Sequence, residues 1–223
     1  MASSIDKLPL IDVAKRLQDM VERKEYNRVL EILDKIKIPD YSTLVYEDVM
    51  EHLYDKVEET GIFPSGGVSG YILTLSNGKK LGQGDKGFWK LIKAENSFMG
   101  AWQVFLFENL WTYLPLFQHS NYEKRHYLYT KEDFVKYMTK EGLDKELGIT
   151  SFDDISVGLG VVEKPSYELV NFDDCYGFRA FYWSRHKGLV NHTEYIFFTD
   201  NNIHIMRISG EKTVIKYDCG IMY

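Results

Sequence analysis

The sequence is poor in the residues that mark several specialised classes of protein. Its 223 residues include two cysteines, Cys175 and Cys219, which are too few for a disulfide scaffold and lack the CxxC spacing of many zinc and redox sites. Basic residues number 27 against 33 acidic ones, which gives a net charge of −6. Because phosphate contacts require a basic surface, this balance disfavours nucleic acid as a partner.

Long uninterrupted apolar runs are also absent. The first 20 residues carry charges throughout and have no apolar h-region, so we expect no secretory signal. The most apolar stretch, residues 98–117, is interrupted by Gln103, Glu108 and Asn109. It therefore predicts a buried core helix and not a transmembrane one. From these features we expect a soluble, cytoplasmic protein without membrane association.

Motifs for catalysis and cofactor binding are incomplete. Residues 82–87 spell GxGxxG, but they follow a predicted hairpin and no βαβ unit, so they indicate a turn before a helix. The HxE formed by His192 and Glu194 lacks the PCxxC of a zinc deaminase. His186 and His192 flank one predicted turn and are interpreted as exposed polar residues. We therefore predict no catalytic residue, no cofactor and no metal site.

The C-terminal third predicts an antiparallel sheet. Aromatic residues make up 15% of the chain, and short segments rich in aromatic and β-branched residues recur from residue 155 onward, separated by turn residues. Spacers this short allow only antiparallel neighbours. One face of this sheet is core. The other face, which includes Tyr182 and Tyr195 with Arg179 and Arg185, is either a recognition surface or, as we favour, covered by helices.

Earlier segments predict helices and one hairpin. Apolar residues repeat with helical spacing in two pieces within residues 8–37, with a break at residues 22–25. Asn77 and Gly78 separate two strand-like runs, which predicts a β-hairpin with a type I′ turn. Thr130, three residues before Asp133, predicts a capping box at the start of a further helix.

These elements place helices first and strands last, which is the pattern of an α+β fold. We expect an N-terminal helical lobe followed by a mixed body that ends in an antiparallel β-meander of about five to six strands. The expected division is residues 1–62 for the helical lobe, packed on the rest, and residues 63–223 for the body.

An acidic column is the main functional signal. Residues 40–60 read as one helix, on which Glu47, Glu51, Asp55 and Glu58 stack on one side. Like charges four residues apart cost a helix roughly 0.2–0.5 kcal/mol per pair. A helix selected only for its own stability would alternate acidic with basic residues. The column is therefore either an ordinary solvated face, which we favour, or a surface that binds a basic partner, which is the strongest functional signal in the sequence.

The leading functional hypothesis is therefore a non-enzymatic protein-binding module that presents these four acidic residues to a basic protein. An immunity- or antitoxin-like inhibitor is one concrete version, because electrostatic steering and occlusion of a basic active site explain inhibition. The first alternative is a small-molecule hydrolase with its site in loops of the C-terminal sheet. A structural or scaffold protein is the second.

Overall fold

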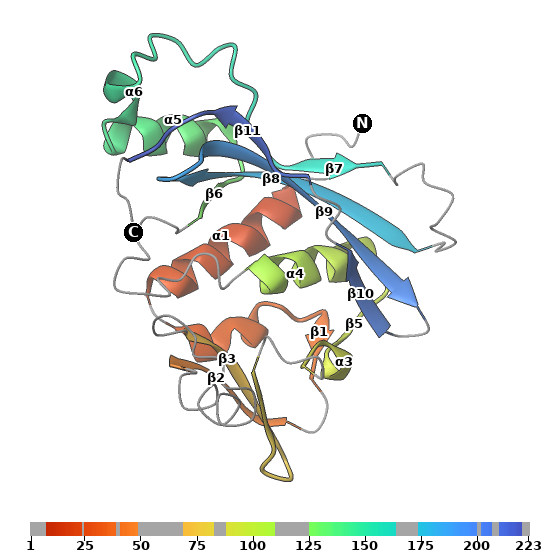
Figure 1. Ribbon diagram of the computed structural model, residues 1–223. Coiled ribbons are helices and arrows are strands. Elements are labelled where there is room, and N and C mark those ends of the chain that lie inside the picture. The colour runs from red at the N-terminus through yellow and green to blue at the C-terminus, as the bar shows by residue number, and fades with distance from the viewer. Residues whose placement is uncertain are drawn as a thin grey trace, which may run out of the picture.

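A computed structural model describes residues 8–23, 25–38, 41–48, 69–82, 88–109, 125–163, 174–199, 202–206 and 210–219. Within these ranges the fold is α+β, with a helix at the N-terminal end and a large antiparallel sheet in the C-terminal half (Figure 1). This confirms the predicted fold class. The division into residues 1–62 and 63–223 stays a prediction.

Six strands form the main sheet: β6 (His126–Leu128), β7 (Gly160–Val162), β8 (Cys175–Ser184), β9 (Gly188–Thr199), β10 (Asn202–Met206) and β11 (Lys212–Ile215). Every pairing between them is antiparallel. The long hairpin of β8 and β9 is the centre. Strands β6 and β7 pair with the free edge of β8, and β10 and β11 pair with different parts of β9. Pairing is therefore sequential from β7 to β10, whereas β6 pairs with β8 and β11 returns to β9.

Helices cover both faces of the sheet, as Figure 1 shows. Alternate residues of β8 point to opposite sides, since strand side chains have a period of two. Phe178, Ala180 and Tyr182 belong to the larger core, together with residues of α1 and α4. Phe181 and Trp183 belong to a second core with α5 and α6. Tyr182 and Tyr195 are both buried, which agrees with the favoured alternative, a sheet covered by helices, and not with a recognition surface at these two residues.

The helices are α1 (Leu8–Glu22), α3 (Phe88–Leu91), α4 (Phe98–Asn109), α5 (Lys131–Lys140) and α6 (Leu143–Glu146), with a 3-10 helix, η2 (Tyr26–Glu31). The break after α1 is confirmed. The second predicted helix is shorter than expected: after η2 the chain forms strand β1 (Ile36–Lys37), which pairs with β5 (Lys93–Ala94). The capping box is confirmed, because Thr130 Oγ1 accepts from the backbone N–H of Asp133 and the Asp133 carboxylate accepts in return.

Strand β2 (Tyr41–Asp48) corrects the sequence interpretation of this region. It pairs with β3 (Ser69–Leu75), which in turn pairs with β4 (Lys80–Gly82). Residues 41–48 were expected to begin the acidic helix, so that prediction is wrong for this stretch. Aromatic and β-branched residues fill it, and these favour a pleated strand over a helix. The remaining residues of the expected helix, 49–60, lie outside the described residues.

The hairpin predicted at Asn77-Gly78 is confirmed, but its turn differs from the predicted type. The Gly78 N–H donates to the carbonyl of Leu75 at 2.9 Å, and the Leu75 N–H donates to Lys79 O at 2.8 Å. Gly78 has a left-handed φ of 83°. This is a three-residue loop with a glycine bulge and not a two-residue type I′ turn.

Helix α4 is the buried helix that the apolar stretch predicted. All ten of its residues from Gly100 to Asn109 are buried, and it packs against β8, β9 and α1, with which it shares one side of the sheet (Figure 1). Among the described residues, none of the helices has the length and apolar character needed to cross a bilayer. The last two residues of α4, Glu108 and Asn109, are polar, and both are buried.

Candidate functional site

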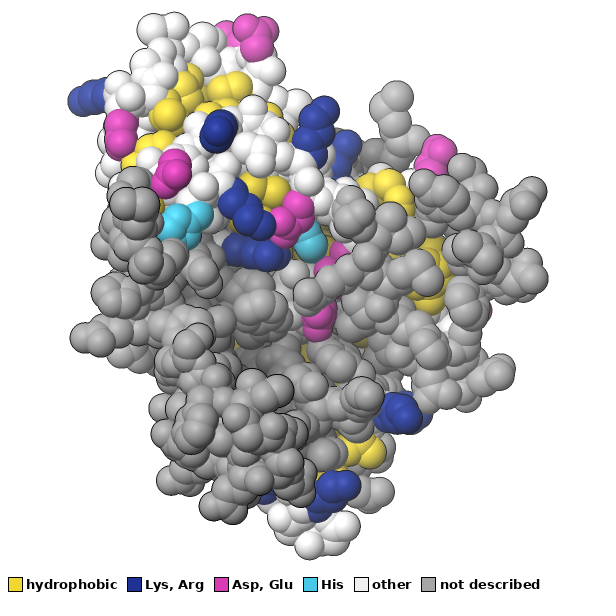
Figure 2. Space-filling model, in the orientation of Figure 1, with side chains coloured by type: hydrophobic (Ala, Val, Ile, Leu, Met, Phe, Trp, Pro, Cys, Tyr) yellow, Lys and Arg dark blue, Asp and Glu magenta, His cyan; other side chains and the backbone are white. Residues whose placement is uncertain are grey.

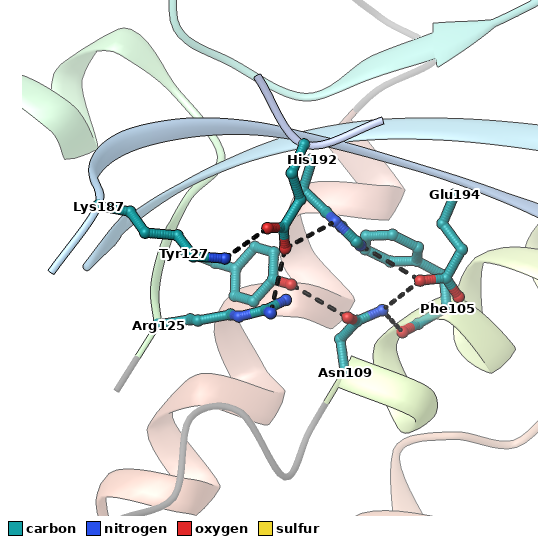
Figure 3. Close-up of polar contacts among 8 residues, drawn as sticks. Phe105, Asn109, Arg125, Tyr127, Lys187, His192 and Glu194 are labelled. Carbon is teal, nitrogen blue, oxygen red and sulfur yellow. Dashed lines mark hydrogen bonds and ion pairs between the residues drawn. The ribbon is translucent and has the colours of Figure 1, made fainter. Parts of the chain in front are cut away.

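Four polar side chains meet inside the larger core, and we call them the buried polar cluster: Asn109, Tyr127, His192 and Glu194 (Figure 3). They come from three elements that are far apart in sequence, namely the C-terminal end of α4, strand β6 and strand β9. Core positions between a helix and a sheet are normally apolar. A concentration of polar groups at such a place is therefore the first candidate for a functional site.

His192 and Glu194 form the centre of the cluster. They are two residues apart on β9, so their side chains leave the same face of the sheet. His192 Nε2 lies 3.2 Å from Glu194 Oε2. Only 6% of His192 and 0% of Glu194 is exposed, so solvent does not compete for this contact. An ionised carboxylate only accepts hydrogen bonds, so with Glu194 ionised the proton of this contact is on Nε2.

Asn109 fixes the position of the Glu194 carboxylate. Its amide donates to Glu194 Oε2 at 3.2 Å and to the carbonyl of Phe105 at 2.8 Å. Its Oδ1 accepts from the hydroxyl of Tyr127 at 3.1 Å. The contact to Phe105 ties the amide to the last turn of α4. Glu194 Oε2 is thus held from both sides, by the amide of Asn109 and by the ring of His192.

Two atoms of the cluster have no hydrogen-bond partner among the described residues. They are Oε1 of Glu194 and Nδ1 of His192, both buried. Burying a polar atom without a partner costs about 1–3 kcal/mol. Such atoms are uncommon in native structures, and a bound water or ion, local strain or a role in a reaction explains them. Asp144, Tyr182, Trp183 and Asn191 have one such atom each, so it is the pairing of His192 with Glu194 that distinguishes the cluster.

Three charged side chains surround the outer side of the cluster. Glu211 pairs with Arg125 at 3.1 Å and with Lys187 at 2.7 Å. Its Oε1 lies 3.9 Å from Nδ1 of His192, beyond hydrogen-bonding distance. Arg125 also lies 4.7 Å above the ring of Tyr182, a cation–π contact. Exposure of these side chains rises from 23% for Arg125 through 32% for Glu211 to 52% for Lys187.

We call Arg125, Lys187 and Glu211 the charged layer, which lies between the protein surface and the buried ring of His192. Figure 2 shows basic, acidic and histidine side chains gathered beside one another on the face that it draws. Burial raises the pKa of the Glu211 carboxyl, but the hydrogen bond from Lys187 and the charge of Arg125 outweigh it and hold that pKa below its ordinary value. Burial raises the pKa of Tyr182 above its ordinary range, although the charge of Arg125 lowers it. Glu211 is thus an anion and Tyr182 is neutral at physiological pH.

The sequence-predicted site residues are not brought together in the described residues. Glu47 lies in strand β2, where it pairs with Gly70, so it cannot head a helical column. Glu51, Asp55 and Glu58 lie outside the described residues, and their role as a partner-binding surface stays a prediction. Of the GxGxxG motif, the first glycine, Gly82, ends β4, and residues 83–87 lie outside the described residues.

Sequence reasoning found two members of the buried polar cluster but misread them. His192 was interpreted as exposed, and it is buried. The signal for the pair was the HxE itself, because alternate residues of a strand share a face. The sequence does not identify Asn109 and Tyr127 as members of the cluster. Both are far from β9 in the sequence, and no local pattern predicts that α4 and β6 meet there.

Comparison of the chain with protein-family models, with curated proteins and with solved structures finds no match. The functional argument therefore rests on the geometry of the buried polar cluster and its charged layer. That geometry offers a histidine with one nitrogen bound to a carboxylate and the other nitrogen without a partner.

Proposed function

We propose that the protein is a small-molecule hydrolase in which His192 is the general base and Glu194 positions it. The observation that carries the proposal is the buried pair itself. His192 Nε2 lies 3.2 Å from Glu194 Oε2, and Nδ1 has no hydrogen-bond partner among the described residues. In this proposal Glu194 is ionised and accepts from Nε2–H, so the lone pair of Nδ1 is available. A histidine oriented by a carboxylate, with its other nitrogen free, is the arrangement that accepts a proton from a nucleophile.

In this proposal the nucleophile is water. Nδ1 removes a proton from the water as its oxygen bonds to the carbonyl carbon of the substrate. The imidazolium formed is stabilised by the charge of Glu194. It then returns the proton to the leaving group when the bond to that group breaks. The base is regenerated and atoms balance: one water is consumed, and an acid and an alcohol or amine are released.

The charged layer supports an anionic substrate. Arg125 and Lys187 both bind the carboxylate of Glu211, and Oε1 of this carboxylate lies 3.9 Å from Nδ1 of His192. A substrate carboxylate that takes the place of Glu211 between the two cations would bring its scissile bond toward Nδ1. Arginine suits this role because its guanidinium binds carboxylates through two parallel hydrogen bonds.

The test compares hydrolysis of two nitrophenyl esters, one neutral and one with a carboxylate, by wild type and three variants. His192→Gln should lower kcat/KM by at least about 100-fold, the usual contribution of a general base. His126→Gln is the matched control, since His126 stacks on Tyr137 and is not a member of the cluster; its rate should equal that of wild type. Arg125→Gln should raise KM for the anionic ester alone.

Two outcomes overturn the hydrolase proposal. One is a wild-type rate no greater than the buffer rate for both esters. The other is a rate in His192→Gln equal to that of wild type. Circular dichroism and thermal melting of each variant separate a lost base from a lost fold.

We also propose, as a second candidate, that the protein binds a basic protein partner through the acidic N-terminal part, and that it does so in the cytoplasm. Residues 1–60 hold 14 acidic and 9 basic residues, whereas residues 61–223 hold 19 and 18. The excess of acidic residues in residues 1–60 supports the proposal whether or not these residues form the helix expected from the sequence. Exposed charges act mainly on the association rate.

The test of this second candidate is a pull-down to obtain a partner, followed by association kinetics of wild type and Glu51→Lys/Asp55→Lys. Association of the double variant should be slower and less dependent on salt. Equal association rates at low salt would rule out the acidic residues as the binding surface. Circular dichroism and thermal melting of the double variant verify that it is folded.

A further inference from the structure

A second group of potential ligand atoms lies at the turn between β8 and β9. His186 is in this turn, and Asp218 and Cys219 follow β11. Their ligand atoms, a ring nitrogen, a carboxylate oxygen and Sγ, all lie within 4.8 Å of one another. No other group of this kind is found among the described residues. From sequence alone no zinc site was predicted, because His186 and Cys219 are too far apart along the chain to match a zinc-binding spacing.

Backbone contacts hold the two segments together. The N–H of Cys219 donates to the carbonyl of Arg185 at 3.0 Å. Strand β11 pairs with β9 up to Ile215 opposite Leu189. At Gly188 the segments touch so closely that an added Cβ would lie 2.0 Å from the carbonyl oxygen of Ile215. The ligand atoms are therefore brought together by the fold, and binding a cation costs little further ordering.

The kind of donor atoms selects the kind of cation. Thiolate and imidazole ligands favour zinc and similar soft divalent metals, whereas calcium and magnesium require oxygen ligands alone. Zinc bonds of about 2.0–2.3 Å place tetrahedral ligand atoms roughly 3.3–3.8 Å apart. Side-chain rotations that move the three ligand atoms by about an ångström therefore suffice to bring all of them within bonding distance of one ion.

We propose that His186, Asp218 and Cys219 bind one zinc ion. Three protein ligands leave the fourth tetrahedral position for water, as in zinc sites that carry out chemistry or take up a further ligand. The ion binds the thiol as thiolate and releases its proton. It would also fasten the segment after β11 to the β8–β9 turn. None of the three ligands belongs to the buried polar cluster, so this proposal does not depend on the proposed hydrolase activity.

The test is a titration of the metal-free protein with cobalt(II), which replaces zinc and reports its own coordination by absorption. Wild type should bind one equivalent and show a thiolate-to-cobalt charge-transfer band with the intense visible bands of tetrahedral cobalt. One equivalent of zinc should abolish both. Cys175→Ser is the matched control, because Cys175 is the other cysteine and lies on β8; it should behave as wild type.

Cys219→Ser should lose the charge-transfer band. Its affinity for cobalt should fall at least about 100-fold, since even changes to groups behind metal ligands cost about 10–100-fold. His186→Gln should weaken binding while keeping the sulfur band. The proposal is overturned by wild type without a charge-transfer band at stoichiometric cobalt, or by the same titration curve in Cys219→Ser and wild type. Thermal melting of each metal-free variant verifies that it is folded.

Discussion

The side-chain amide of Asn109 donates to Oε2 of Glu194 at 3.2 Å, although the two residues are 85 positions apart in the sequence. Through this hydrogen bond the end of α4 is connected to the centre of β9. The bond is buried and one partner is a carboxylate, so it belongs to the stronger class of hydrogen bonds. It both stabilises the fold and fixes the residue that orients His192.

Replacing Asn109 with Leu should therefore destabilise the protein by about 3 kcal/mol, because a buried hydrogen bond to a charged group contributes about 1.5–3 kcal/mol and the bond from Tyr127 is lost as well. Urea unfolding measures the change. Asn96→Ala is the control: Asn96 is exposed and donates to Asp174, and its loss should cost less than about 0.5 kcal/mol. If both variants lower the free energy of unfolding equally, the hydrogen bonds of Asn109 in the cluster stabilise the fold no more than an exposed hydrogen bond does.

The close approach at Gly188 predicts a large effect of one methyl group. Gly188 has φ 79°, and Cβ there would collide with the carbonyl of Ile215 and the N–H of Tyr217. Gly78 has φ 83° with nothing within 4 Å of the Cβ position. Gly78→Ala should cost about 1–2 kcal/mol for the left-handed backbone alone, and Gly188→Ala should cost more, by displacing β11. Thermal unfolding of the two variants makes the comparison, and equal shifts would contradict it.

Acid should weaken the protein through Glu211. Its pKa in the folded protein lies below its ordinary value of 4.5, so its contribution is complete above that value and is lost as the pH falls through the folded pKa. The difference in Tm between wild type and Glu211→Gln should then be largest near neutral pH and shrink in acid. Glu163→Gln, at an exposed position, is the control. If the difference in Tm between wild type and Glu211→Gln does not change with pH, the ion pairs of Glu211 are not its cause.

The start of α5 predicts a capping effect. Thr130→Ala removes the acceptor for the N–H of Asp133 and should cost about 1 kcal/mol. Thr139→Ala, on the exposed side of the same helix, should cost much less, since alanine has the higher helix propensity. Asp133 also pairs with Lys15 of α1 at 2.9 Å. If both alanine variants unfold at the same urea concentration, the cap does not stabilise the helix.

Local signals in the sequence predicted local structure well. The Asn77-Gly78 hairpin and the Thr130 capping box depend on residues within a few positions, and both are present. Antiparallel pairing after residue 155 followed from spacers too short for a crossover. The error at residues 41–48 has a physical reason: valines four residues apart fit a helix, but pairing with β3 decided the outcome, and that partner begins 21 residues after β2 ends.

The buried polar cluster was beyond prediction for the same reason. His192 and Glu194 are visible as an HxE, yet their burial depends on α4 lying against β9. Nothing in the residues around Asn109 states that this helix ends there. The ligands of the proposed zinc site likewise come from a turn and from a segment more than 30 residues later.

The most direct test of the central claim is the tautomer of His192. Nitrogen-15 NMR of histidine side chains, with His192→Gln to assign the signals, reports which ring nitrogen carries the proton. The account predicts a neutral ring at mildly alkaline pH, protonated at Nε2 and free at Nδ1, and a loss of this bias in Glu194→Gln. A ring protonated at Nδ1, or at both nitrogens, would leave no lone pair to accept the proton of water and would contradict the role of His192 as general base.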